Sequence, residues 1–283
     1  MNKIAEYCFK KMYPNENFQR LGAGVRSIAF RSERGKIIRI KPLWSGTYDK
    51  EEKILNFIKK NGGIDCNIPD IKAFVSMPYA FSEHLDFGGK IATITDFETL
   101  DAETQKSFAR QLATSLISLH KMGMKPGAKK IFNQKTYKTR IKNFFRQIQF
   151  ILFFMDNKKR LNLWMSLCRS ALKVFQRKKP LQGLAHDDLH FSNVIEDDKY
   201  NLLGLIDFGE IRYLPVEYNL RKFPKYLRDW VVKYWTEDGY ETDLALLNYY
   251  RAKYLLTRLV KRKHKQPREN LEQELYQVVV EQI

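Results

Sequence analysis

Two short polar stretches interrupt apolar runs late in the chain, and they constrain the fold more than any other feature. The first, AHDDLHFSNVI (185–195), holds two aspartates, two histidines, a serine and an asparagine. The second, LIDFGE, closes an apolar run with Asp207. The residues that connect them, NVIEDDKYNLLGLID, have the pattern of a β-hairpin with its turn at EDDK. Such a hairpin would return Asn193 and Asp207 to one edge of the fold.

The polar residues of these stretches have the chemistry that phosphoryl transfer requires. Asp188 follows the apolar segment LQGLA, where a loop carboxylate can accept a proton from a hydroxyl group. Asn193 and Asp207 offer one neutral and one charged oxygen, which suits Mg²⁺ because that ion keeps waters and takes few protein ligands. A base beside a magnesium site favours phosphoryl transfer. Taken separately, each stretch also fits a polar loop in which Asn and Asp serve a turn.

A glycine turn in the first third of the chain is the candidate nucleotide-binding loop. LGAGVRS carries Gly22 and Gly24 between two predicted strands. Small residues there let backbone N–H groups approach phosphate oxygens. Ser27 stands where a third glycine would be expected, and it is small and can donate a hydrogen bond. By itself, a glycine pair is also typical of an ordinary hairpin turn.

A nucleotide site also needs a cation for the α- and β-phosphates. The predicted strand IIRIK offers Arg39 and Lys41, which a strand places on the same face. The residue two positions before the cation would lie nearer the adenine. For Arg39 this residue is the apolar Ile37, whereas for Lys41 it is a charged arginine. The pattern favours Arg39 and leaves Lys41 open, and both also fit surface charges on an edge strand.

The helix predicted for YDKEEKILNFIKK would supply an acidic partner for the chosen cation. Glu51 fits this role better than Glu52, because Ile54, Leu55 and Ile58 then form the inner face of the helix. The glycine pair that follows would end the helix.

The element pattern changes near residue 95. Strands and turns dominate before it, with KIATITDFE as a short strand that has a polar exit. AETQKSFARQLATSLISLHKMG has apolar residues at helical spacing, two further helices are predicted through the basic segment, and the chain is helical again from Leu214. We therefore expect an α+β fold with two lobes, a nucleotide-binding sheet plus helix over 1–95 and a mostly helical lobe over 96–283.

Positive charge is concentrated in one segment. The chain of 283 residues has a formal net charge of +18, and residues 125–180 contain sixteen Lys or Arg and one acid, Asp156. That segment therefore has a net charge of +15 and the rest of the chain has +3, so an anionic partner should bind at this segment. Its aromatic residues alternate with the charges, as in a helix that lies on a membrane surface. The alternative is a core of aromatics beneath a solvated charged face.

Cysteine usage and the N-terminal sequence predict a cytoplasmic protein. Cys8, Cys66 and Cys168 are far apart and form no CxxC pair, which fits a reducing compartment. The N-terminus lacks the apolar core of a signal peptide. The longest apolar run, Ile148–Met155, is far shorter than the roughly 20 residues that span a bilayer.

With these residues in place, the chain resembles the aminoglycoside phosphotransferase and choline kinase-like family, which shares the protein-kinase fold. HDDLHFSN is similar to that family's H-x-D-L-H-x-x-N loop, LIDFGE to its metal-binding aspartate segment, and LATSLISLHKMG to its helix that ends in Leu-His. The resemblance runs from the glycine turn to about Gly209. It implies a bilobal kinase-like fold and an enzyme that uses ATP or GTP with Mg²⁺ to phosphorylate an alcohol group.

The resemblance also implies roles for individual residues. Asp188 would be the catalytic base, His186 would brace the loop, and Asn193 and Asp207 would be the magnesium ligands. Asp187 departs from the small residue that is usual between His and Asp, and we expect it to be a solvated carboxylate. A second departure places arginine where the family usually has the phosphate-binding lysine.

The charge distribution bears on the acceptor. An aminoglycoside is a polycation, which the +15 segment would repel. The favoured acceptor is therefore an anionic sugar or glycolipid, like a lipopolysaccharide core, met at the inner face of the membrane through 125–180. The alternatives are a small-molecule kinase that acts on an antibiotic or amino alcohol, and a pseudokinase that binds without catalysis. No motif supports nucleic acid as a partner, and the sequence does not indicate an oligomeric state.

Overall fold

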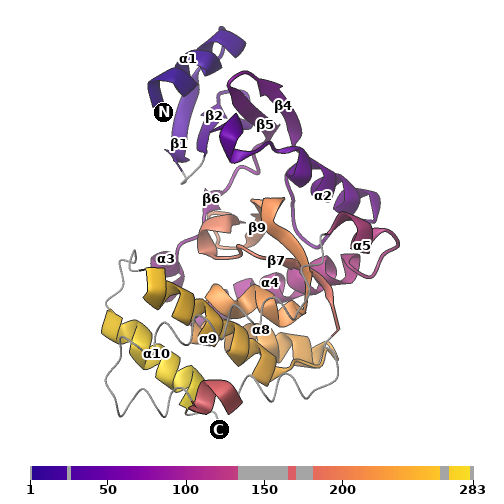
Figure 1. Ribbon diagram of the computed structural model, residues 1–283, viewed down its shortest axis with the longest axis vertical. Helices are drawn as coiled ribbons and strands as arrows, with labels where there is room; N and C mark the ends of the chain where they lie inside the picture. The colour runs from indigo at the N-terminus through magenta and orange to yellow at the C-terminus, as the bar shows by residue number, and fades with distance from the viewer. Residues whose placement is uncertain (1, 24–26, 133–164, 170–180, 262–267, 281–283) are drawn as a thin grey trace.

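The computed structural model describes residues 2–23, 27–132, 165–169, 181–261 and 268–280. Figure 1 shows a strand-rich N-terminal lobe above a mostly helical C-terminal lobe. The α+β class and the bilobal arrangement predicted from the sequence are therefore confirmed.

The N-terminal lobe is built on a five-stranded antiparallel sheet with the strand order β1-β2-β3-β5-β4. Its central strand buries Ile38 and Ile40 in a cluster that includes Phe9, and it turns Arg39 to the other face. The elements of this lobe are α1 (Asn2–Met12), β1 (Phe18–Ala23), β2 (Ile28–Ser32), β3 (Lys36–Pro42), η1 (Leu43–Ser45), α2 (Asp49–Lys60), β4 (Lys72–Ser76) and β5 (Tyr79–Leu85).

Helix α1 corrects the expectation of strands and turns at the start of the chain. The Phe9 ring lies 4.1 Å from that of Phe18 and 4.8 Å from that of Phe30, measured between centroids. The helix has 11 residues and no acidic residue in its first turn. Isolated helices of this length are marginal in water, so contact with the sheet stabilises α1 and local sequence gives little sign of it.

Helix α2 agrees with the prediction. It buries Glu51, Ile54, Leu55 and Ile58, and its first turn is acidic, which suits the positive end of the helix dipole. Gly62 follows the helix with a φ of 108°. Only glycine adopts this conformation without strain, so the chain leaves the helical path at this point.

The connection between the lobes differs from the predicted strand in KIATITDFE. Only β6 (Lys90–Ile91) is extended, and it pairs with β8 (Val194–Glu196). The chain then enters α3 (Ile94–Thr99), because the Thr93 hydroxyl accepts a hydrogen bond from the N–H of Asp96 at 3.0 Å and caps this helix.

Helix α4 (Ala102–Met122) is the predicted long helix, and Asp101 caps its N-terminus. Its apolar stripe is fully buried against α8 (Lys225–Glu237) and β7 (Gly183–His186). The close approach to β7 requires glycine: a Cβ atom on Gly123 would lie 2.5 Å from the Cα of Gly183. This packing fixes the strand that leads into the polar loop.

The remaining elements include the predicted hairpin of β8 and β9, and the helices expected after Leu214 are present. In the described part of the chain, no helix is long and apolar enough to cross a membrane. The helices predicted in the basic segment, and the run Ile148–Met155, lie mostly or wholly outside the described residues. The other elements are α5 (Ala128–Ile131), η2 (Phe191–Asn193), β9 (Leu202–Leu205), η3 (Phe208–Glu210), β10 (Ile211–Leu214), η4 (Val216–Lys222), α9 (Leu244–Lys261) and α10 (Arg268–Val280).

Candidate active site

The polar loop, residues 187–193, is pinned to the protein interior by its apolar members. Leu189 and Phe191 are buried in the main core of the C-terminal lobe. The Phe191 ring also meets Phe223 edge-on, with centroids 5.3 Å apart. These contacts fix the backbone of the loop, and they thereby set the directions of its polar side chains.

His186, at the end of β7, braces this loop from within. Its ring is fully buried, and Nε2 lies 2.9 Å from the carbonyl oxygen of Ile206. Nδ1 accepts a hydrogen bond from the N–H of Asp188 at 3.2 Å, so the proton belongs on Nε2. Burial lowers the pKa of His186 to about 4, and the ring is neutral at pH 7. His186 therefore holds two backbone segments together.

Asp188 is the more exposed of the two carboxylates in the loop, with 44% of its side chain accessible. Oδ1 forms an ion pair with Nζ of Lys222, and Oδ2 lies 3.7 Å from Nε2 of His190. Burial alone would raise the pKa of Asp188, but the contacts with His190 and Lys222 outweigh it and hold the pKa below its ordinary value. The carboxylate is thus ionised at pH 7, in the state that a general base needs.

The hairpin brings Asn193 and Asp207 to one edge, as predicted. The N–H of Ile206 donates to the carbonyl oxygen of Asn193 at 3.1 Å, directly before Asp207. The Asn193 side chain donates a hydrogen bond from Nδ2 to the carbonyl oxygen of Asp188 at 2.9 Å. Because Nδ2 is used in this way, Oδ1 is the side-chain atom that can bind a cation. Asp207 has a φ of 64°, a left-handed conformation that aspartate tolerates better than most residues.

Arg39 and Glu51 connect the N-terminal lobe to Asp207. Nη2 of Arg39 lies 2.8 Å from Oε2 of Glu51, and Nη1 lies 3.9 Å from Oδ1 of Asp207. The other oxygen of Glu51 accepts a hydrogen bond from the N–H of Phe208 at 3.0 Å. One buried carboxylate therefore joins the central strand β3, helix α2 and the segment that follows the hairpin.

The alternatives left open by the sequence lie elsewhere. Lys41 donates from Nζ to the carbonyl oxygen of Thr47 at 2.9 Å, at the surface. Glu52 accepts a hydrogen bond from the N–H of Ala73 at 3.1 Å. The structure thus brings Arg39, and not Lys41, to the helix carboxylate and to Asp207.

The glycine turn is described in part. Gly22 lies in β1, next to a register shift in the pairing of β1 with β2. Gly24 lies outside the described residues. Ser27 directly precedes β2, and its side chain interacts with Tyr48 at the start of α2. The nucleotide-binding role of this turn remains a prediction.

Asp187 corrects the expectation of a solvated carboxylate. Only 14% of its side chain is accessible, and Oδ2 lies 2.6 Å from Nε of Arg212. Oδ1 lies 2.9 Å from Nη2 of Arg221 and also accepts a hydrogen bond from the Tyr218 hydroxyl. The partners come from β10 and η4, more than twenty residues further along the chain, so no local sequence pattern predicts them.

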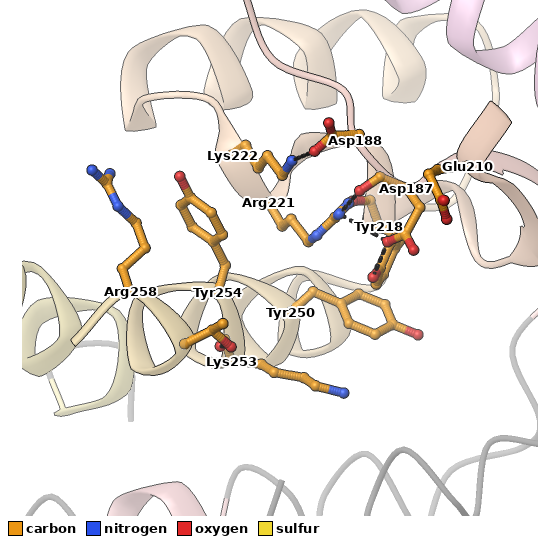
Figure 2. Close-up of a pocket in the computed structure, with 11 residues that line it drawn as sticks. Asp187, Asp188, Glu210, Tyr218, Arg221, Lys222, Tyr250, Lys253, Tyr254 and Arg258 are labelled. Carbon is orange, nitrogen blue, oxygen red and sulfur yellow. Dashed lines mark hydrogen bonds and ion pairs between the residues drawn. The ribbon is translucent and has the colours of Figure 1, made fainter. Parts of the chain in front are cut away.

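A pocket opens beside Asp188, and we call it the α9 pocket. Its volume is about 580 Å³, and Figure 2 shows Asp187, Asp188 and Lys222 on one side and α9 on the other. Helix η4 also supports the loop, although no sequence pattern predicts it: its Lys222 forms an ion pair with Asp188, and Oδ1 of Asn219 accepts a hydrogen bond from the backbone N–H of His186 at 2.7 Å. The lining residues are Asp187, Asp188, Glu210, Tyr218, Arg221, Lys222, Tyr250, Lys253, Tyr254, Thr257 and Arg258.

No family model and no curated protein matches the sequence. Solved structures match it along nearly its whole length. Aminoglycoside 2'-phosphotransferase-IIIa in complex with GDP gives a TM-score of 0.75 at 17% identity, covering 99% of this chain and 98% of that chain. An ADP-bound aminoglycoside phosphotransferase gives a TM-score of 0.69 at 16% identity, covering 99% of this chain and 97% of that chain. Macrolide 2'-phosphotransferase type I gives a TM-score of 0.67 at 14% identity, covering 97% of this chain and 98% of that chain.

At these identities the likeness shows the fold. The chain has the protein-kinase-like fold of antibiotic phosphotransferases, in agreement with the resemblance drawn from its motifs.

Proposed function

We propose that this chain is a phosphotransferase that moves the γ-phosphoryl group of ATP or GTP to a hydroxyl group of a small molecule. The observation that carries this proposal is the chain of contacts from Arg39 through Glu51 to Phe208 and Asp207. These contacts bring the Arg39 guanidinium and the Asp207 carboxylate together next to the hairpin that follows the loop bearing Asp188, which supports a phosphate-binding role for Arg39 and a metal-binding role for Asp207. The bound ADP and GDP in the solved structures of the same fold support a nucleotide as the donor.

Asn193 and Asp207 fit a magnesium ion. Burial, and then the nearby Glu51 carboxylate, raise the pKa of Asp207, so a cation at its oxygens would relieve an unfavourable charge. Among the described residues, no cluster of three or more His, Cys, Asp or Glu side chains is arranged to hold a metal. Two protein oxygens suit Mg²⁺, which fills its octahedral shell with water and nucleotide phosphate oxygens. When bound, the ion would offset charge on the transferred phosphoryl group.

Each proposed site residue has a separate role in phosphoryl transfer. Arg39 binds the phosphate tail of the nucleotide, and Glu51 fixes its guanidinium. Asp188 orients the acceptor hydroxyl and accepts its proton while the hydroxyl oxygen bonds to the γ-phosphorus. The bond from the γ-phosphorus to the bridging oxygen breaks, and the nucleoside diphosphate leaves. His186 is neutral and holds Asp188 in place, and Lys222 keeps the Asp188 carboxylate ionised.

A small-molecule acceptor is the alternative that the comparisons support best. The solved structures of this fold are named for aminoglycoside and macrolide acceptors, and the α9 pocket has the volume of a ligand site. The preference for a glycolipid at a cytoplasmic membrane face rested on 125–180, which lies largely outside the described residues. The comparisons lend that preference no support, and it remains a hypothesis.

The proposed function is tested by two measurements on the full chain. Mg²⁺ with ATP or GTP should raise the melting temperature, because a ligand that binds only the folded state stabilises it. A screen of hydroxyl compounds should then find one that speeds nucleotide consumption. Stabilisation without turnover for any compound would favour the pseudokinase, and no stabilisation would contradict the proposal.

A further inference from the structure

The segment that follows the hairpin carries Asp207 and continues into η3, and its backbone is tied at both ends to the C-terminal lobe. Before Asp207, the N–H of Ile206 donates a hydrogen bond to the carbonyl oxygen of Asn193 at 3.1 Å. After it, the carbonyl oxygen of Glu210 accepts a hydrogen bond from the N–H of Asp187 at 3.2 Å. The two residues that lie between Asp207 and Glu210 are held from the other lobe.

Successive residues at the start of α2, which belongs to the N-terminal lobe (Figure 1), hold those two positions. Oε1 of Glu51 accepts a hydrogen bond from the N–H of Phe208 at 3.0 Å. Nζ of Lys50 donates a hydrogen bond to the carbonyl oxygen of Gly209 at 2.7 Å, and these two residues are 159 positions apart in the chain. One hydrogen bond leaves the backbone free to rotate about its own axis, whereas a second one on the next residue removes that freedom.

Asp207 depends on this backbone for its orientation. Its φ of 64° is a sparsely populated conformation, which persists where the surrounding structure holds it. The described residues offer its carboxylate one ion pair, with Nη1 of Arg39 at 3.9 Å, and 49% of its side chain is accessible. A Cβ atom on Gly209 would lie 4.0 Å from Oδ1 of Asp207, so the peptide that Lys50 holds lies next to the carboxylate.

Lys50 is not needed for the packing of α2. Its side chain is exposed, and the buried face of the helix contains Ile54, Leu55 and Ile58. Lys53, one turn later, is also exposed and has no hydrogen bond or ion pair within the described parts of the chain. Lys50 differs from Lys53 because its ammonium group reaches a backbone carbonyl of the other lobe.

We propose that Lys50 is a positioning residue for the magnesium site. By holding the carbonyl oxygen of Gly209, Lys50 fixes the orientation in which the Asp207 carboxylate binds the ion, and it contacts neither the ion nor the nucleotide. The first turn of α2 then serves both halves of the donor site, because Glu51 fixes the guanidinium of Arg39 and Lys50 fixes the backbone beside Asp207. This inference rests on the proposed function, because it assigns a further residue to the same site.

Hydrogen exchange in the metal-free full chain tests the structural part of the proposal. In Lys50→Met, the peptide that covers residues 206–211 should exchange about three-fold faster or more, because local opening of η3 becomes easier. Lys50→Arg keeps a cation of similar reach and should restore slow exchange. Lys53→Met removes a charge one turn away and should exchange like the parent. Parental exchange in Lys50→Met would overturn the proposal.

The metal part is tested by the factor by which saturating Mg²⁺ tightens nucleotide binding, measured by calorimetry with Mg²⁺ and with EDTA. Lys50→Met should reduce this factor about five-fold, as expected for the loss of one hydrogen bond worth about 1 kcal/mol. Nucleotide affinity in EDTA should stay parental, and Lys50→Arg should recover the factor. Equal weakening with and without Mg²⁺ would show that Lys50 binds the nucleotide itself, which would contradict a positioning role.

The same measurements separate this inference from the proposed function. If Mg²⁺ does not tighten nucleotide binding to the parent chain, the proposed function fails and this inference fails with it. If Mg²⁺ acts on the parent and acts equally on Lys50→Met, this inference is refuted and the phosphotransferase stands. An equal loss in Lys50→Met and Lys53→Met would indicate a general effect of positive charge on α2 and would also refute the assignment to Lys50.

Discussion

The two sides of the polar loop are built in different ways. On the nucleotide side, Arg39, Glu51 and Asp207 meet through contacts that short sequence patterns already indicate. On the acceptor side, Asp187 and Asp188 meet cations from β10 and η4, and α9 closes the pocket. Under the proposed function, the residues of transfer chemistry lie in a few short stretches, whereas acceptor choice depends on the helices that follow them.

Two neighbouring aspartates show the same division within the loop. Asp187 is held by two arginines and a tyrosine and is nearly buried. Asp188 has a single lysine partner and a half-exposed carboxylate that can reach a substrate. We therefore propose that these adjacent aspartates serve stability and chemistry separately, and the following changes should distinguish them.

The largest effect is expected on the nucleotide side. Asp207→Ala removes the only charged candidate ligand of the magnesium pair, so stabilisation by Mg²⁺ and nucleotide should be lost. That stabilisation is about 4 kcal/mol at a thousand-fold excess over Kd. Asn193→Ala removes a dipole and not a charge, so it should lose less of the stabilisation by Mg²⁺ and nucleotide. Melting curves with and without Mg²⁺ and nucleotide measure both, and parental stabilisation of Asp207→Ala would show that Asp207 is not a ligand.

On the acceptor side, the expected effect is on folding. Asp187→Ala leaves Arg212 and Arg221 without their shared carboxylate, and breaking a buried ion pair in this way costs about 3 kcal/mol of unfolding free energy. Nucleotide binding by the folded fraction should persist. Urea unfolding measures the loss, with exposed Asp198→Ala as the control. A loss as small as that of the control would mean that Asp187 is solvated after all.

The meeting of Arg39 with Glu51 could be predicted from the sequence because both residues lie in recognisable patterns, whereas their role in nucleotide binding remains a proposal. Strand periodicity placed Arg39 and Lys41 on one face, and the apolar face of α2 selected Glu51 over Glu52. Lys222 was missed because η4 carries no motif, and its contact with Asp188 spans 34 residues of chain. Such a pairing depends on how β7, β10 and α9 pack, which local propensity does not specify.

A smaller effect should separate Arg39 from Lys41. Arg39→Met removes charge-assisted hydrogen bonds to phosphate and should weaken nucleotide binding by about 2 kcal/mol. Lys41→Met, a matched change on the same strand, should have little effect because Lys41 points to the carbonyl oxygen of Thr47. Titration calorimetry with Mg²⁺ and nucleotide compares them. The reverse order would return the phosphate-binding role to Lys41.

The smallest expected effect is a shift in pH dependence. Lys222→Met removes the cation that, together with the contact with His190, holds the pKa of Asp188 down, so that pKa should rise. A base acts only when ionised, and activity is lost as the pH falls through its pKa. The acidic limb of the kcat/KM profile should therefore move to higher pH. Lys225→Met, which removes an exposed cation paired with Asp229, should leave the limb in place.

Transfer of labelled γ-phosphoryl to an acceptor hydroxyl, compared between the parent chain and Asp188→Asn, tests the central claim most directly. The substitution keeps the shape of the side chain but removes the base, so turnover should fall by about 100-fold or more. Stabilisation by Mg²⁺ and nucleotide should remain. Asp198→Asn, in the exposed turn of the hairpin, should transfer at the parental rate. Near-parental transfer by Asp188→Asn would contradict the account.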